Sequence, residues 1–252
     1  MINKTLFKQY WKSNWKLLVI ITSVLVLFLI MMIFAYNQML IRAEEAGGIG
    51  STLDLTSFLS VSYLGGMCLL LPMVFTIVVA NKSVASKIDK GSLGIVLSTK
   101  TTRNQVTFTN ALGLILSLIG MFAVVFVGGI ITSSIMAPDS LVVLDYFELL
   151  VGMLMLQLAL SGISYFASCT FNTSGRSLAI GAGIPIIFYV ISILSSIDSS
   201  IEFFKYFTLM TLYNPTDILS STFIWQYLVL GVIAVVGYGA GIAIFKKKDL
   251  PL

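Results

Sequence analysis

The chain has 252 residues, of which 58% are hydrophobic and only 10% are charged, and its formal net charge is +4. Soluble domains contain about 25% charged residues, so this composition excludes an ordinary soluble globular domain. The sequence has no histidine, which excludes zinc sites built on histidine and nucleophiles activated by an imidazole.

Six uncharged stretches are long enough for a helix to cross a bilayer, which needs roughly twenty apolar residues. The first is longer than the hydrophobic region of a signal peptide and no small-residue cleavage site follows it, so we expect it to remain as a membrane anchor. The third exceeds one crossing, which leaves open whether it tilts or breaks near Gly128 and Gly129. The expected spans are residues 17–36, 58–80, 106–136, 149–167, 177–197 and 223–245.

Basic residues alternate in step with these spans. They lie before the first span, between the second and third, between the fourth and fifth, and after the sixth, which leaves only Arg42 and Lys205 of the 15 on the other side. Cytoplasmic loops of membrane proteins carry the excess of Lys and Arg. We therefore expect a multi-pass protein of the plasma membrane with both termini in the cytoplasm.

Two segments outside the spans are expected to lie at the membrane surface. In residues 1–16 a lysine recurs at every fourth position beside aromatic residues, which predicts an amphipathic helix in the headgroup plane. Residues 198–222 are too apolar for a solvated loop and too charged for a crossing. They predict a re-entrant segment on the outer side, with a short helix over 201–212 that is ended by Asn214 and Pro215.

The polar chemistry inside the spans is sparse. No acidic or basic residue lies near the middle of any expected span, whereas proton-coupled carriers usually keep one there. Gln157 is the most polar side chain at depth, and it indicates either an interhelical hydrogen bond or a contact in a substrate path. Ser161 and Ser164, in LSGISY, have no histidine or membrane-embedded lysine to activate them. We interpret them as small residues at a helix contact.

Two of the expected spans contain proline or glycine residues that affect helix geometry and packing. Pro72 and Pro185 lie inside the second and fifth spans and are expected to loosen those helices. Gly65 and Gly66 are expected to permit a close approach between helices.

A compact basic segment, residues 82–103, separates the second and third spans and contains SKIDKGSLGIVLSTKTTR. Its apolar residues fall into two sets at helical spacing, and Gly91 and Gly94 interrupt them and allow a turn. Its glycines and lysines lack the spacing of a phosphate-binding loop. The segment is typical either of a basic loop resting on lipid headgroups or of a short helix that docks in a groove of a cytoplasmic partner.

This segment resembles the corresponding region of the ABC-2-type permeases, the membrane subunits of one class of ABC transporters. That family shows an acidic residue, Gly-Thr, a leucine pair and Pro-x-x-Arg after the second span. The matching residues here are Asp89, Gly91, Ser92, Val96, Leu97 and Arg103.

The resemblance extends along nearly the whole chain but has departures. The stretch FASCTFNTSGRSLAIGAG resembles the family's link between spans four and five, and the ending FKKKDLPL resembles its carboxyl terminus. Lys100 replaces the proline, and Gly94 and Asn110 stand where an acid and a lysine are common.

The resemblance implies an all-α membrane fold with six transmembrane helices in a single domain, residues 1–252. Residues 1–16 would be a connecting helix, 82–103 would hold a coupling helix, and 198–222 would form an outer re-entrant hairpin. Two permease chains, identical or sister chains, would pair and bind two copies of an ABC ATPase. No cofactor would bind this chain, because ATP and Mg would sit in the ATPase, and no nucleic acid partner is expected.

The resemblance also assigns candidate residues to two roles. Spans two and five would line the substrate path. The residues expected to contact the ATPase are Lys87, Ile88, Asp89, Gly91, Ser92, Leu93, Val96, Leu97 and Arg103. The residues expected along the substrate path are Tyr63, Met67, Phe75, Gln157, Ile187 and Tyr189.

Small permeases of this shape resemble those that export toxic or antimicrobial peptides in Gram-positive bacteria, or give immunity to them, such as exporters of the phenol-soluble modulin type. We therefore expect a non-catalytic subunit of a bacterial exporter for amphipathic or hydrophobic peptides. Drugs and lipid-linked molecules are neighbouring substrate classes. A channel, facilitator or membrane scaffold that works without an ATPase is the alternative from another class.

Overall fold

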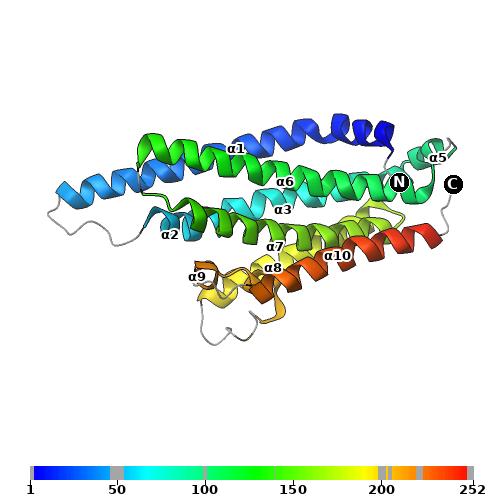
Figure 1. Cartoon of the computed structure of the whole chain (residues 1–252). Helices are drawn as coiled ribbons and strands as arrows, with labels where there is room; N and C mark the ends of the chain where they lie inside the picture. Colours follow the sequence, from blue (N-terminus) through cyan, green and yellow to red (C-terminus); the bar gives the residue numbers. More distant parts are fainter. Residues whose placement is uncertain are drawn as a thin grey trace.

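The computed structural model describes residues 3–45, 54–98, 101–138, 140–197, 203, 206–219 and 224–248. Within these ranges every regular element is a helix, and the helices run side by side as an elongated bundle (Figure 1). The elements are α1 Lys4–Glu45, α2 Leu55–Leu59, η1 Ser60–Leu64, α3 Met67–Ser83, α4 Ala85–Asp89, α5 Ser92–Leu97, α6 Arg103–Met136, α7 Val143–Thr170, α8 Ser174–Ile197, η3 Leu209–Leu212, α9 Pro215–Leu219 and α10 Ile224–Lys247.

Six helical segments in this part of the chain are long and apolar enough to cross a membrane, as the sequence predicts. By helix length and hydropathy the chain is a multi-pass membrane protein. The second crossing comprises α2, η1, α3 and α4, and the others are α1, α6, α7, α8 and α10. Helix α1 begins and α10 ends at the same end of the bundle (Figure 1), as an even number of crossings requires.

Helix α7 forms the centre of the bundle. It contacts α10, α8, α3 and α6. In its most apolar 18-residue stretch 67% of the residues are buried, against 17% in the corresponding stretch of α8. Helix α1 pairs with α6 on one side of the bundle. The outer faces of α1, α6, α8 and α10 expose large apolar side chains, which is the surface that lipid covers in a membrane.

Small residues allow α7 and α10 to cross at close range. The backbone of Gly162 lies against the backbones of Ala234 and Gly237, and the hydroxyl groups of Ser161 and Tyr238 share a hydrogen bond of 2.7 Å. On the other side of α7, the Ser164 hydroxyl donates to the carbonyl of Gly181 on α8 at 2.7 Å. The interpretation of LSGISY as a helix contact is confirmed.

Buried tyrosines join neighbouring helices by donating to backbone carbonyls. Tyr63 donates to Leu25 at 3.1 Å, Tyr146 to Val125 at 3.2 Å, and Tyr165 to Thr107 at 2.6 Å. These bonds link η1 to α1 and α7 to α6 at two levels. Lipid chains are as apolar as leucine, so packing and interhelical hydrogen bonds rather than hydrophobic burial hold such helices together.

The change Tyr165→Phe is expected to lower the free energy of unfolding by about 0.6 kcal/mol and by no more than about 1.7 kcal/mol, the average and the maximum for hydrogen bonds between transmembrane helices. The temperature at which the buried thiols of Cys68 and Cys169 become reactive measures this loss. Tyr189→Phe is the matched control, because the hydroxyl of the half-buried Tyr189 makes no hydrogen bond within the described residues. Equal melting temperatures for the two variants would show that the Tyr165 hydroxyl does not stabilise the contact between α7 and α6.

The second crossing is interrupted, which its apolar sequence does not reveal. Residues Ser60–Leu64 form a π-helical turn, η1, and α3 begins only after Gly65 and Gly66. A Cβ on Gly65 would lie 2.9 Å from the carbonyl oxygen of Val61, so this glycine fits the tight turn within its own segment rather than a contact with another helix. Pro72 lies inside α3, which continues past it.

The amino-terminal segment differs from the expectation for residues 1–16. Helix α1 is continuous over 42 residues, about 63 Å at 1.5 Å per residue, with no separate helix available to lie in the headgroup plane. Tyr10 explains the continuity, because its ring packs against Gly113 of α6 and its hydroxyl bonds to the Ser117 hydroxyl at 3.3 Å. The first turns of α1 are therefore held along α6.

The third expected span forms a single helix, α6, and does not break near Gly128 and Gly129. It runs from Arg103 to Met136 without a break. The space at Gly129 is taken by the Tyr146 ring, and Gly128 faces Val26 of α1. The two glycines therefore make room for neighbouring side chains.

The segment 198–222, which is expected on the outer side, is described only at residue 203 and residues 206–219. Here η3 ends before Tyr213, and Pro215 opens α9, a position that suits proline because the first helical N–H needs no partner. Tyr213 and Asn214 therefore separate two short helices, and Pro215 is the first residue of the second. Tyr213 and Ile218 are buried and pack over Gly152 of α7, so this part folds back onto the bundle. The predicted helix over 201–212 lies partly outside the described residues.

Candidate functional site

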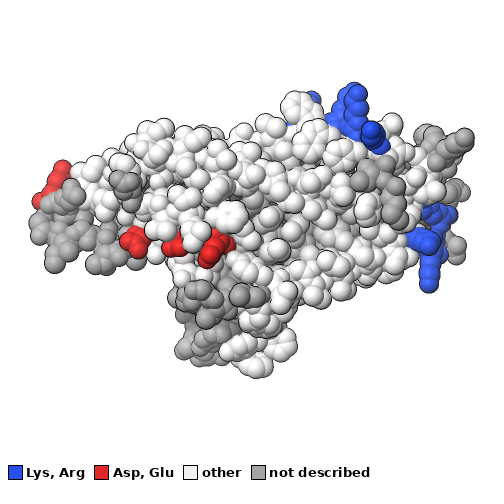
Figure 2. All heavy atoms as spheres, in the orientation of Figure 1, with Lys and Arg blue, Asp and Glu red and all other residues white. Residues whose placement is uncertain are grey.

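The basic segment forms a short helical hairpin, α4 and α5, which we call the basic hairpin (residues 85–97). It lies at the end of the bundle where α1 begins and α10 ends (Figure 1). Lys and Arg side chains gather toward this end, whereas Asp and Glu gather toward the opposite end (Figure 2). This separation of charge agrees with the predicted alternation of loops, and the placement of the basic end in the cytoplasm stays a prediction.

Gly91 makes the turn between the two helices. Its φ angle is +67°, in the left-handed region that glycine enters without a steric penalty, and its N–H donates to the Ile88 carbonyl at 2.9 Å. The predicted turn at Gly91 is confirmed. Gly94, in contrast, lies inside α5 and does not interrupt it.

The apolar side chains of the basic hairpin face the chain's own bundle. Val84, Ile88 and Leu93 are buried in its hydrophobic core. Ile88 and Leu93 therefore anchor the hairpin to this protein, whereas a partner that docks on it would meet Asp89, Lys90 and Gly91, which are exposed. Lys87 and Ser92 are half-buried, and the side chains of Val96 and Leu97 lie outside the described part of the structure.

Three hydrogen bonds attach α3 and α4 to the end of α7 and the start of α8. The backbone N–H of Ala85 donates to the Ser168 hydroxyl at 3.1 Å, and the Asn81 amide donates to the Ser174 hydroxyl at 2.7 Å. The Ser174 N–H donates to the Asp89 carboxylate at 3.3 Å. Because Ser174 begins α8, the Asp89 charge also lies at the positive end of that helix, a favourable arrangement.

At the same end of the bundle, further hydrogen bonds join α6 to α3, α6 to the end of α10, and the end of α10 to α7. The Asn110 amide of α6 donates to the Ser83 carbonyl at 3.0 Å. Arg103 donates to the carbonyl of Lys248 at 2.6 Å, and the Lys248 ammonium donates to the carbonyl of Cys169 at 3.1 Å. Burial lowers the pKa of Lys248. The hydrogen bond from Arg103 to Lys248 links the start of α6 to the end of α10.

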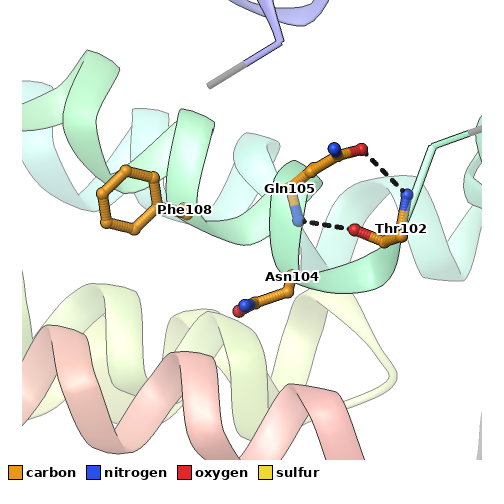
Figure 3. A pocket seen from close by; sticks show the side chains of 4 residues that line it. All are labelled: Thr102, Asn104, Gln105 and Phe108. Carbon is orange, nitrogen blue, oxygen red and sulfur yellow. Dashed lines mark hydrogen bonds between the residues drawn. The ribbon is translucent and has the colours of Figure 1, made fainter. Parts of the chain in front are cut away.

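A capping box fixes the point where the basic segment ends and α6 begins. Thr102 accepts from the Gln105 N–H at 3.3 Å, and the Thr102 N–H donates to the Gln105 side chain at 3.1 Å (Figure 3). These bonds satisfy two backbone donors at the helix start. The adjacent hollow, about 170 Å³, is lined by Thr102, Asn104, Gln105 and Phe108, and it is smaller than the roughly 300–1,000 Å³ of a drug-sized site.

The residues predicted along a substrate path differ in their exposure within this chain. Tyr63, Phe75 and Gln157 are fully buried between helices, and the Gln157 amide donates to the Leu69 carbonyl of α3 at 2.7 Å. The interhelical hydrogen bond expected as one reading of Gln157 is therefore present. Met67 and Tyr189 are half-buried and Ile187 is exposed, and their place on a path stays a prediction.

Sequence reasoning missed the polar residues that hold the hairpin in place. Asn81, Asn110, Ser168 and Ser174 lie near the ends of expected spans and bond across 27 to 93 residues. The available signal is that each is a small hydroxyl or amide residue near a span end, where a helix terminus needs hydrogen-bond partners.

No protein-family model matches this chain, and no curated protein matches it. The fold and the site define its class as a multi-pass α-helical membrane protein with a basic helical hairpin at the end where both termini lie. Any finer assignment depends on the hairpin's geometry and on the sequence resemblance.

Proposed function

We propose that the chain is the membrane-spanning subunit of an ATP-driven exporter of the ABC-2 kind, in which a separate ATPase binds the basic hairpin. The observation that carries this proposal is that the hairpin is anchored through its apolar face and leaves its turn exposed, at Asp89, Lys90 and Gly91. A loop that merely rests on headgroups needs no such anchoring.

The attachments of the hairpin give a route for transmitting force. Helix α4 follows α3 directly, and Asn81 and Asp89 bond to Ser174 at the start of α8. A partner that pushes on the turn would therefore displace α3 and α8 together. In the proposed mechanism, closure of two ATPase subunits tilts these helices in a pair of permease chains and alternates access to the path between them. The break at Gly65 and Gly66 offers a place for α3 to bend.

The proposed substrates are amphipathic or hydrophobic peptides moved outward. The spans carry no fixed charge near their middle, which suits an apolar cargo better than an ion or a sugar. Drugs and lipid-linked molecules share this property, so the peptide class rests on the resemblance to small peptide-export permeases.

Purification of the tagged chain from its native host in mild detergent tests the proposal. We expect an ATPase with a phosphate-binding loop to co-purify in stoichiometric amount. Lys90→Glu, which reverses a charge on an exposed side chain, is expected to reduce the recovered ATPase at least about fivefold, because like or unpaired charges at an interface are costly.

Lys246→Glu is the matched control, because Lys246 is also exposed and lies in the last turn of α10 at the same end. It should recover the ATPase as the unchanged chain does. If no ATPase accompanies the unchanged chain, under conditions that preserve known ABC complexes, ATP coupling is refuted and a channel, facilitator or scaffold becomes the better explanation.

A further inference from the structure

A small polar pocket lies between the first turns of α1 and the end of α3 with α4. Its volume is about 60 Å³, and its lining includes Gln9, Ser13 and Asn14 from α1 and Lys82 and Lys87 from the other side. A hollow of this size admits a phosphate group but not a drug-sized ligand, which needs roughly 300–1,000 Å³. The pocket is separate from the exposed turn of the basic hairpin.

The charge of this pocket is uncompensated. Lys87 is half-buried, and neither Lys82 nor Lys87 has an ion pair within the described residues. No carboxylate is among the residues that line the pocket. Lys82 is exposed, so the argument from burial applies to Lys87. Partly removing its ammonium group from water without an opposite charge is unfavourable, and an anion in the pocket would compensate it.

Asn14 supplies a second, independent indication of a ligand. Its side chain is only 7% exposed, and its Nδ2 donates to the Tyr10 carbonyl at 3.1 Å. Its Oδ1 has no hydrogen-bond partner in the described structure, although buried polar atoms are nearly always paired. The Asn14 Oδ1 atom therefore lacks a donor, which a hydroxyl group of a bound ligand would supply.

The surroundings place the pocket at the level of lipid headgroups. Lys8 and Lys12 are exposed on the neighbouring surface of α1, and Trp11 and Trp15 are 43% and 45% exposed. Exposed tryptophans and lysines beside an apolar span are typical of the membrane–water interface. Phosphate is abundant there as part of lipid headgroups.

We propose that this pocket binds the phosphate of an anionic lipid headgroup, with Lys82 and Lys87 facing the phosphate and Asn14 accepting a hydrogen bond from a hydroxyl group of the same headgroup. Phosphatidylglycerol has both features. The bound lipid would bridge α1 to α3 and α4 beside the basic hairpin. This inference holds whether or not the chain works with an ATPase.

The test uses the full chain in lipid nanodiscs of phosphatidylcholine with added phosphatidylglycerol, followed by native mass spectrometry of the protein released into detergent. Lys82→Gln with Lys87→Gln is expected to reduce the retained phosphatidylglycerol about thirtyfold, the combined effect of about 1 kcal/mol for each lysine. Lys8→Gln with Lys12→Gln is the control and should change retention by less than about twofold. Equal losses in the two double variants would overturn the proposal, because they would report net charge alone.

A single substitution separates the pocket from general charge effects. Asn14→Asp keeps the shape of the side chain but places a negative charge beside the phosphate, so it is expected to reduce retention as strongly as the double lysine change. Unchanged retention in this variant would overturn the assignment of Asn14.

The source of the phosphate is tested in the same experiment. Retention of phosphatidylglycerol in the presence of millimolar inorganic phosphate supports a lipid site. Displacement of the lipid by inorganic phosphate would assign the pocket to a soluble anion and overturn the lipid assignment.

Discussion

Gly237→Leu is expected to lower the free energy of unfolding by at least about 1–3 kcal/mol, the usual cost of overpacking a close contact. A Cβ on Gly237 would lie 2.8 Å from the carbonyl carbon of Gly162. The obstructing atoms belong to the backbone of α7 and cannot rotate away, so α10 would have to move. The contact between α7 and α10 is the most extensive in the bundle, which is why this substitution is the most damaging one that we expect.

Gly239→Leu is the matched control for this prediction. It lies on the same helix two residues later, and a Cβ there would meet no atom within 4 Å. The thermal reactivity of the buried thiols Cys68 and Cys169 reports both variants. A lower melting temperature for Gly237→Leu alone is the expected result. A similar loss in both would mean that leucine disturbs α10 by itself and that its approach to α7 is not limiting.

The crossings could be predicted from the sequence because the hydrocarbon core demands about twenty apolar residues in each. The same requirement does not predict where a helix is interrupted within a crossing. The apolar character of the second crossing continues unchanged through Gly65 and Gly66, where the helix is interrupted, and Pro72, the expected weak point, lies inside a continuous helix. The lysine pattern of residues 1–16 likewise could not reveal that Tyr10 packs on α6 and that α1 continues as one helix.

The turn of the candidate site could be predicted from the sequence, but the direction in which the apolar face of the hairpin points could not. Gly91 indicated a reversal of the chain, and it is there. Helical spacing of apolar residues predicts that one face of a helix is covered, but not by what, and Ile88 and Leu93 prove to face the chain's own core. The bond from Asn81 to Ser174 joins residues 93 positions apart, and no local pattern in a single sequence predicts such a pair.

Gly91→Val is expected to reduce export at least about tenfold, whereas Gly91→Asn should keep most of it. The φ angle of Gly91 is +67°. A left-handed conformation costs an ordinary residue roughly 1–2 kcal/mol and is especially unfavourable for a β-branched one, but asparagine adopts it readily. Since a Cβ at this position would meet no atom within 4 Å, the two variants differ through the backbone of the turn and not through clashes with neighbours.

Release of a labelled amphipathic peptide by proteoliposomes that hold the chain and its ATPase measures this difference. The thiol melting temperature should stay close to that of the unchanged chain in the asparagine variant and fall only modestly in the valine variant, because the strain is confined to one exposed residue. Loss of export in the valine variant with retained ATP hydrolysis would place the turn in the coupling step. Equal export by the valine and asparagine variants would show that the shape of this turn does not transmit the ATPase motion, and the proposed route through Asp89 to α8 would then fail.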